Sequence, residues 1–138
     1  MLAMKSYGKG DITVKNKKLD VLIIDDEEEF ASALLERLKL RSIEAYAANS
    51  GGQALALLEE QRPDIVVLDV IMPGMGGLEI LKRIKMLDSP PQVILLTGRG
   101  STKEGMEGMR LGAFDYLVKP VDIEELIGKM KAAVKTIQ

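Results

Sequence analysis

The chain has 138 residues, a length typical of one domain and sufficient to bury a hydrophobic core. It contains no cysteine and no histidine, which excludes disulfides, thiolate or imidazole metal ligands, cysteine nucleophiles and a Ser-His-Asp triad. Its 19 basic and 21 acidic residues leave a formal net charge of −2 at pH 7. Any chemistry must therefore use carboxylates, lysines, hydroxyls and backbone, which favour a hard, oxygen-ligated cation such as Mg²⁺.

Residues 1–18 carry five lysines against one aspartate, whereas the rest of the chain is acidic. We expect a flexible basic N-terminal leader here, followed by one domain over 19–138. A tether for nucleic acid or a partner is the less favoured interpretation. The leader lacks the apolar core of a signal peptide, and no apolar run approaches the ~20 residues of a membrane span. We expect a cytoplasmic protein with no membrane contact and, since aromatic residues are few, no direct nucleic-acid binding.

From residue 19 onward, short apolar runs alternate with segments that have helical spacing. Residues 21–24 are apolar, rich in β-branched side chains and followed by acids, which is typical of a strand buried on both faces. Apolar side chains then recur every fourth residue, as on one face of a helix: Phe30, Leu34 and Leu38. Apolar and more polar side chains alternate weakly over residues 43–47, which predicts an edge strand.

Ser50 and Gln53 form a capping box that predicts a helix start, and Pro63 closes this helix. Residues 65–68 predict a second buried strand with Asp69 at its carboxyl end. A loop rich in glycine follows, and apolar residues then return at helical spacing: Leu78, Leu81 and Ile84.

Residues 93–96 predict the next strand, which ends at Thr97. A helix is expected over 101–112, although Gly105 and Gly108 each cost about 1 kcal/mol relative to alanine. This cost predicts that the helix is the most mobile in the chain.

Residues 116–118 predict a short strand before Lys119 and Pro120, and Asp122 with Glu125 caps a last helix. The apolar residues of this helix share one stripe: Ile123, Leu126, Ile127, Met130, Val134 and Ile137. Five strands alternating with five helices predict an α/β fold, a single doubly wound parallel sheet with helices on both faces.

Polar residues gather where these strands end. Asp25 and Asp26 follow the first strand, Asp69 the third, Thr97 the fourth and Lys119 the fifth. In open parallel sheets, sites form beyond the carboxyl ends of the strands, so these residues should converge. A lone aspartate at a strand end is most often a helix cap, but features at four different strand ends favour a functional site.

Such a set of residues suits phosphoryl transfer. Three close carboxylates do not all ionise readily unless a cation lies among them, and Mg²⁺ has the required preference for oxygen. With the metal on one oxygen and Lys119 on another, an aspartate could attack phosphorus, while Thr97 donates a hydrogen bond to a phosphoryl oxygen. This route needs no histidine on the chain.

The ordered set resembles the receiver domain of two-component response regulators, over residues 19 to about 137. Besides the strand-end residues, two stretches carry the resemblance: Asp69-x-x-Met72-Pro73-Gly74 and Gly112-Ala113-x-Asp115-Tyr116-Leu117-x-Lys119-Pro120. The resemblance implies a flavodoxin-like sheet with strand order 2-1-3-4-5.

The resemblance also implies a phosphoacceptor and a metal site. Asp69 would accept a phosphoryl group from a histidine kinase or phosphotransfer protein. Asp26, Asp69 and the backbone carbonyl of Ile71 would bind Mg²⁺ directly, with Asp25 acting through water. The chain would be a signalling domain, catalysing only its own phosphoryl transfer and dephosphorylation.

The resemblance further implies a switch. Lys119 and Thr97 would contact the phosphoryl group, and Tyr116 would turn inward as Thr97 moves. The face formed by residues 101–136 would then signal to a downstream protein target or output domain, or form a homodimer. Ile71 and Arg99 flank the path of attacking water and would tune the phosphoryl lifetime, which we expect to be minutes or longer.

Other interpretations stay open. The main alternative is a phosphate-independent interaction domain of the same fold. A phosphatase with an aspartate nucleophile typically has a second acid two positions later, where this chain has Ile71. Mononucleotide binding is a less supported interpretation. The glycines at 74–77 do not have the spacing of a dinucleotide-binding motif, and no P-loop lysine follows them.

Overall fold

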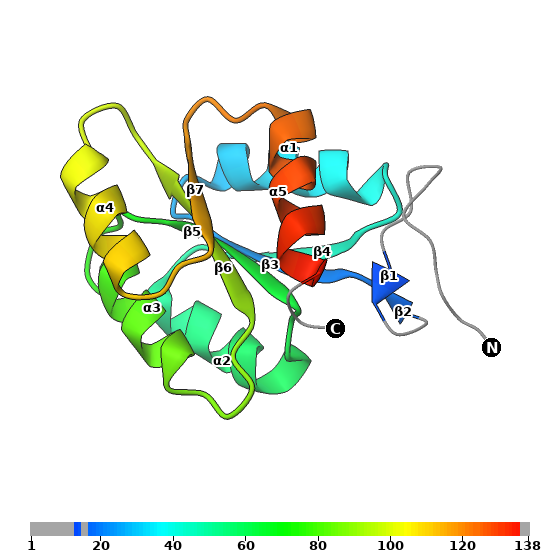
Figure 1. Cartoon of the computed structure of the whole chain (residues 1–138), viewed down its shortest axis with the longest axis horizontal. Coiled ribbons are helices and arrows are strands. Elements are labelled where there is room, and N and C mark those ends of the chain that lie inside the picture. Colours follow the sequence, from blue (N-terminus) through cyan, green and yellow to red (C-terminus); the bar gives the residue numbers. More distant parts are fainter. Residues whose placement is uncertain (1–12, 15–16, 136–138) are drawn as a thin grey trace.

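A five-stranded parallel sheet with helices on both faces forms the centre of the molecule (Figure 1). The computed structural model describes residues 13–14 and 17–135. Within them the strands are β1 (Thr13–Val14), β2 (Lys17–Lys18), β3 (Asp20–Ile24), β4 (Glu44–Ala48), β5 (Ile65–Asp69), β6 (Gln92–Thr97) and β7 (Asp115–Val118). The helices are α1 (Glu28–Lys39), α2 (Gly51–Gln61), α3 (Gly77–Lys85), α4 (Thr102–Arg110) and α5 (Ile123–Lys135).

The strand order in the sheet is β4-β3-β5-β6-β7, with every neighbouring pair parallel. Counting only these strands along the chain gives 2-1-3-4-5, which confirms the predicted order. The register aligns Ile24 with Leu68, Asp69 with Leu96, and Thr97 with Val118. The carboxyl ends of β3, β5, β6 and β7 therefore lie close to level at one edge of the sheet.

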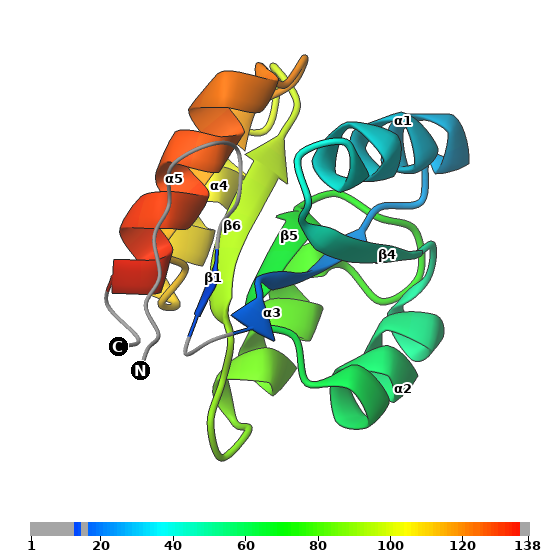
Figure 2. The same cartoon turned by 90° about the vertical axis from the view of Figure 1, so that its right-hand side faces the viewer.

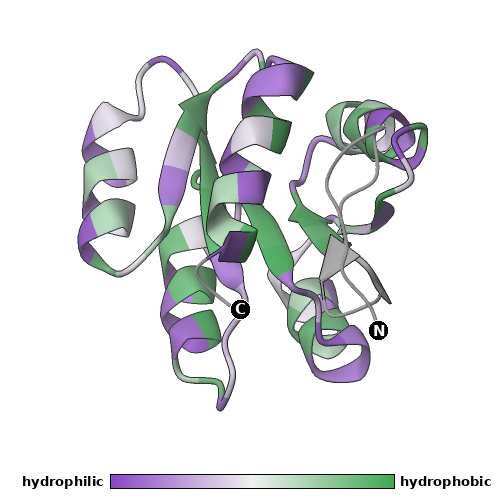
Figure 3. Cartoon of the chain, turned by 45° about the vertical axis from the view of Figure 1, so that its right-hand side comes forward, coloured by the Kyte–Doolittle hydropathy of each residue, from purple (hydrophilic) through white to green (hydrophobic). Residues whose placement is uncertain are grey.

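The strands are buried on both faces because successive side chains point to opposite sides. Val21 and Ile23 face one core cluster, which α1 and α5 cover. Leu22 and Ile24 face the other, to which α2 and α3 contribute. Figure 2 shows the helices arranged around the sheet, and in Figure 3 the hydrophobic colour follows the strands in its middle. No helix among residues 17–135 is long and apolar enough to cross a membrane.

Local signals from the sequence are found where they were predicted. The Ser50 hydroxyl accepts a hydrogen bond from the Gln53 amide at 3.2 Å, and the Gln53 side chain in return accepts one from the Asn49 amide at 2.8 Å. Asp122 caps α5 by accepting from the Glu124 amide at 2.9 Å. The predicted capping box at Ser50 and the capping contact of Asp122 are therefore confirmed, while the role of Glu125 stays a prediction.

The expected N-terminal leader contains a short element that the sequence did not predict. β1 and β2 pair antiparallel, with Thr13 opposite Lys18 and Val14 opposite Lys17. The remainder of that leader, residues 1–12 and 15–16, lies outside the described residues, as does Ile137 at the expected end of the last helix.

The glycines of α4 have a packing role that the sequence interpretation did not include. A Cβ atom at Gly105 would lie 3.0 Å from Cγ2 of Thr97, and one at Gly108 would overlap the end of the Leu95 side chain. Both glycines are buried and face β6. Their lack of side chains therefore lets α4 lie directly on the strand that ends at Thr97. The expected mobility of this helix stays a prediction.

Gly77 provides a test of the packing that places Asp69. It begins α3, its amide donates to the Val70 carbonyl at 3.0 Å, and an added Cβ would lie 2.6 Å from that carbonyl oxygen. Because backbone must move to relieve this overlap, Gly77→Ala should lower the free energy of unfolding by about 1–3 kcal/mol. Urea denaturation followed by circular dichroism measures it.

The matched control is Gly128→Ala in α5. Gly128 is exposed, and an added Cβ would meet nothing within 4 Å. Alanine there should raise the free energy of unfolding by about 0.5–1 kcal/mol, because a helical glycine loses more conformational entropy. Equal stability of Gly77→Ala and the wild type would contradict the close approach of α3 to the end of β5.

Candidate functional site

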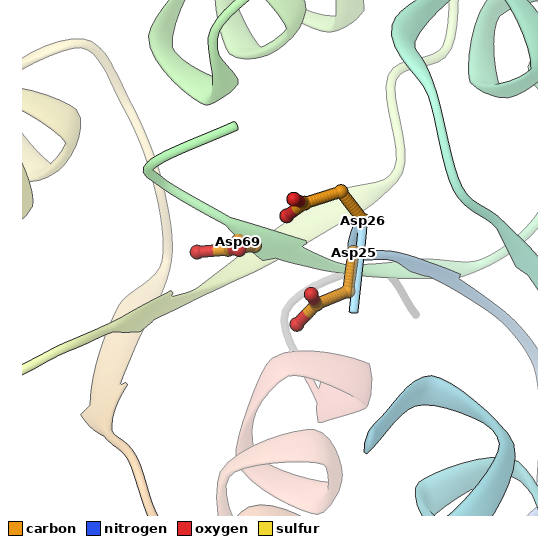
Figure 4. Close-up of side chains that lie close together, drawn as sticks. All are labelled: Asp25, Asp26 and Asp69. Carbon is orange, nitrogen blue, oxygen red and sulfur yellow. The ribbon is translucent and has the colours of Figure 1, made fainter. Parts of the chain in front are cut away.

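Three aspartates meet at the carboxyl edge of the sheet, as the sequence predicted. Asp25 and Asp26 follow β3, and Asp69 is the last residue of β5 (Figure 4). One carboxylate oxygen from each lies within 4.8 Å of the others. Asp25 is fully buried and Asp69 is 6% exposed, while Asp26 is more accessible than both. Two neighbouring parallel strands thus bring negative charge together in a mostly buried position.

The backbone around Asp25 fixes its carboxylate in place. Its amide donates to the Ala48 carbonyl of β4 at 3.0 Å, and the Asn49 side chain donates to its own carbonyl at 2.9 Å. Its Oδ1 accepts from the Glu27 amide at 2.9 Å, at the start of α1. Asp25 therefore holds the backbone just before α1 through Oδ1 and still offers Oδ2 to the site.

Burial raises the pKa of Asp69 to about 6, and the negative charge of Asp25 adds to this effect. The charge of Lys119 and the Ile71 amide, which donates to Asp69 Oδ1 at 3.2 Å, act in the opposite direction. Asp26 contributes a smaller further rise. The Asp69 carboxylate is therefore electrostatically crowded and would be stabilised by a cation among the three acids.

Lys119 brings positive charge to this cluster from the end of β7. Its Nζ lies 2.8 Å from Asp25 Oδ2, 2.7 Å from Glu27 Oε1 and 3.7 Å from Asp69 Oδ2. It also lies 4.4 Å from the centre of the Phe30 ring. Burial lowers the pKa of Lys119, but the carboxylates of Asp25 and Glu27 outweigh that effect and raise it overall, so the ammonium group stays charged.

Lys119 forms an ion pair with Asp69 at 3.7 Å. It also makes two shorter contacts, with Asp25 and with Glu27, and the contact with Glu27 was not predicted from the sequence. Glu27 was missed because an acid at the start of a helix is explained by the helix dipole alone. Its place directly after the acidic pair was the available signal.

The remaining predicted residues differ in their exposure to solvent. Thr97 is 2% exposed, and its hydroxyl donates to the Leu117 carbonyl at 3.3 Å. Tyr116, on the edge strand β7, is 44% exposed. Ile71 is 52% exposed and Arg99 is also exposed. The structure therefore gathers Asp25, Asp26, Asp69, Lys119 and Thr97 at one edge and leaves the other three accessible to solvent.

The stretch of chain that carries these residues matches a known family. The family model for the response regulator receiver domain matches residues 21–131. This chain therefore belongs to the receiver domain family of two-component response regulators. The match includes all the strand-end residues described above.

Among curated relatives, the chain is 38% identical over 119 residues to the uncharacterized transcriptional regulatory protein YkoG of Bacillus subtilis, covering 86% of this chain and 52% of that protein. It is 39% identical over 115 residues to the transcriptional regulatory protein CpxR of Klebsiella pneumoniae, covering 83% and 49%. The chain thus spans about half the length of these relatives.

Solved receiver domains share the fold. One from Clostridium thermocellum superposes with a TM-score of 0.82 at 31% identity, covering 86% of this chain and 96% of that one. The receiver domain of the Francisella response regulator 1452 gives 0.79 at 30% identity, covering 88% and 100%. Their similarity supports the sheet order and the placement of helices found here.

The raised pKa of Asp69 predicts a pH-dependent stability without metal. The Asp69 carboxyl group has a pKa near 6 in the folded state and 3.8 in the unfolded state, so it favours folding most when it is protonated. Its contribution to the free energy of unfolding therefore falls as the pH rises from about 4 to 6. The Asp69→Asn variant has no ionisable group at this position, so it should not lose stability in this way as the pH rises. Without divalent ions, Asp69→Asn should therefore raise the thermal midpoint more at pH 7.5 than at pH 4.

Thermal unfolding of both proteins across this pH range, with and without MgCl₂, measures the difference. The metal should raise the midpoint of the wild type at pH 7.5 more than that of Asp69→Asn. An advantage of Asp69→Asn that is equal at both pH values would show that the Asp69 carboxylate is not destabilised by its surroundings.

Proposed function

We propose that this receiver domain is a phosphorylation-activated signalling switch in which Asp69 accepts a phosphoryl group with Mg²⁺ bound beside it. The observation that carries the proposal is the cluster of three aspartates within 4.8 Å, with the Lys119 ammonium 3.7 Å from Asp69. The donor would be a histidine kinase or a phosphotransfer protein, because the chain belongs to the receiver family.

The donor set fits a hard divalent cation. The three acids supply only oxygen, and burial together with the charge of Asp25 raises the pKa of Asp69, a cost that a nearby cation would reduce. Asp26, Asp69 and the Ile71 backbone carbonyl would hold Mg²⁺ directly, with Asp25 acting through water. When bound, Mg²⁺ supplies positive charge that stabilises both the carboxylates and the oxygens of an incoming phosphoryl group.

Phosphoryl transfer to Asp69 follows from this arrangement. A carboxylate oxygen of Asp69 attacks phosphorus, a new oxygen–phosphorus bond forms, and the bond to the donor breaks with its electron pair leaving on the donor. The product is an acyl phosphate, whose phosphoryl group carries nearly two negative charges in place of the single charge of the carboxylate. Lys119 is close enough to Asp69 to stabilise this added charge, and the Thr97 hydroxyl can turn from the Leu117 carbonyl toward a phosphoryl oxygen.

Movement of Thr97 would carry the signal to the surface. Its methyl group packs where α4 has Gly105, so a shift of Thr97 changes the support of this helix. Tyr116 is exposed on the neighbouring strand and would turn inward into the space that Thr97 leaves. The face over residues 101–136 would then change shape, and it carries exposed apolar side chains such as Met106 and Val118.

A downstream protein or an output domain would read this face, and a homodimer formed through it is part of the same proposal. The domain would catalyse only its own phosphorylation and dephosphorylation, would work in the cytoplasm, and would not itself bind nucleic acid. The relatives named as transcriptional regulators are about twice as long as the matched region, so nucleic-acid contacts of a full-length regulator would be made elsewhere.

Phosphoryl uptake is tested by intact mass after incubation with acetyl phosphate. The wild type should gain one phosphoryl group only with Mg²⁺, and Asp69→Asn should gain none because the attacking carboxylate is absent. Asp26→Ala should weaken Mg²⁺ binding about tenfold or more, since even outer-shell partners of a metal contribute that much.

No adduct on the wild type, repeated with a panel of histidine kinases, would contradict the proposal. Partner binding that Asp69→Asn leaves unchanged would then favour the phosphate-independent interaction domain.

The phosphoryl lifetime is set by how easily water reaches Asp69. Exposed Ile71 and Arg99 offer no carboxylate or amide to orient water, so the phosphoryl group should persist for minutes or longer. Ile71→Asn and Arg99→Glu each introduce a polar side chain that can orient the attacking water molecule. Because one hydrogen bond contributes about 0.5–1.5 kcal/mol, each should speed decay about two- to tenfold. Decay of the phosphorylated mass after removal of acetyl phosphate measures this, and unchanged rates would remove these positions from lifetime control.

A further inference from the structure

Glu27 is the closest carboxylate to Lys119 and has no role in the function proposed above. It stands at the N-terminus of α1, and its Oε1 lies 2.7 Å from Lys119 Nζ. Its side chain is 63% exposed. Its backbone is fixed by two hydrogen bonds, since its amide donates to Asp25 Oδ1 at 2.9 Å and its carbonyl accepts from the Ala31 amide at 3.0 Å.

The contacts of Lys119 are uneven across the site. An ammonium group has three protons to donate. The short contacts of Lys119 lie with Asp25 at 2.8 Å and Glu27 at 2.7 Å, whereas Asp69 is 3.7 Å away. The Phe30 ring, 4.4 Å from Nζ, also comes from α1. Movement of the ammonium toward a phosphoryl oxygen on Asp69 would lengthen its short contacts with Asp25 and Glu27.

We infer that Glu27 is a positioning residue that holds Lys119 away from Asp69 in the unphosphorylated domain and competes with the phosphoryl group for its ammonium. This inference rests on the proposed function and deepens it. Phosphorylation moves Lys119 toward Asp69 only after the ion pair with Glu27 is released. Glu27 thereby biases the domain toward its unphosphorylated arrangement.

Glu27, rather than Asp25, is the contact that can be released. Asp25 is fully buried and its other oxygen accepts from the Glu27 amide, so its position is set by the fold. Glu27 has a longer side chain in contact with solvent, where water can replace the ammonium at little cost. An exposed ion pair of this kind is screened by salt. The restraint is therefore weak enough for phosphorylation to overcome.

The test compares Glu27→Gln with the wild type at saturating Mg²⁺. The rate of phosphoryl uptake from acetyl phosphate, followed by intact mass, should rise about two- to fivefold, the factor that an exposed ion pair contributes. The apparent affinity for beryllofluoride, a phosphoryl mimic that forms without group transfer, should rise by a similar factor in a calorimetric titration. Both increases should shrink at 1 M salt because screening already weakens the wild-type pair.

Glu28→Gln is the matched control, because it removes the same charge one residue further along α1. Glu28 is exposed, and among the described residues it forms no ion pair with Lys119. Its uptake rate and beryllofluoride affinity should stay near those of the wild type. Both variants make the surface less acidic, which could by itself ease the approach of the anionic acetyl phosphate. Only Glu27→Gln also releases Lys119, so a gain seen in that variant alone is due to the release.

The outcomes distinguish the inference from the function on which it rests. Uptake by the wild type with no gain in Glu27→Gln, or an equal gain in Glu28→Gln, overturns the restraint and leaves the proposed function intact. Absence of uptake and of beryllofluoride binding in the wild type overturns both. A gain confined to Glu27→Gln that fades in 1 M salt supports the restraint of Lys119.

Discussion

Burial of Asp25 and Asp69 at the carboxyl edge of the sheet is the constraint on which the rest of the site depends. Parallel register brings Asp25 beside Asp69 in a mostly buried position, where burial and mutual charge keep the pKa of Asp69 near 6. The Lys119 ammonium balances part of this charge and leaves the remainder for a cation. A phosphoryl group on Asp69 would add further negative charge to this edge of the sheet. The Lys119 ammonium would then shift its contacts toward the phosphoryl group, and this shift is the start of the proposed switch.

The fold connects this electrostatic centre to the surface through a short path. Thr97 ends β6 at the site, and Gly105 of α4 packs against its methyl group with no side chain between them. The same hydroxyl donates to the Leu117 carbonyl of β7, the strand that carries the exposed Tyr116. A change at Thr97 therefore acts on one helix and one edge strand together. The proposed output face follows from these two contacts.

Much of this architecture could be predicted from the sequence because its signals are local. Buried strands appear as apolar runs such as residues 21–24, the Ser50–Gln53 capping box marks a helix start, and polar residues at strand ends must converge once the sheet is parallel. Contacts between elements could not be predicted in the same way. Gly105 appears in the sequence only as a helix-weakening residue, and Glu27 only as a first-turn acid; their roles depend on which atoms of β6 and Lys119 lie opposite them.

The location of the phosphoryl group tests the central claim most directly. After incubation with acetyl phosphate and Mg²⁺, borohydride reduces an aspartyl phosphate to homoserine, which tandem mass spectrometry places at a single residue. The account predicts homoserine at position 69, and none there when Mg²⁺ is withheld. Homoserine at Asp25 or Asp26 instead, or phosphate on a hydroxyl side chain, would contradict the assignment of Asp69 as the acceptor.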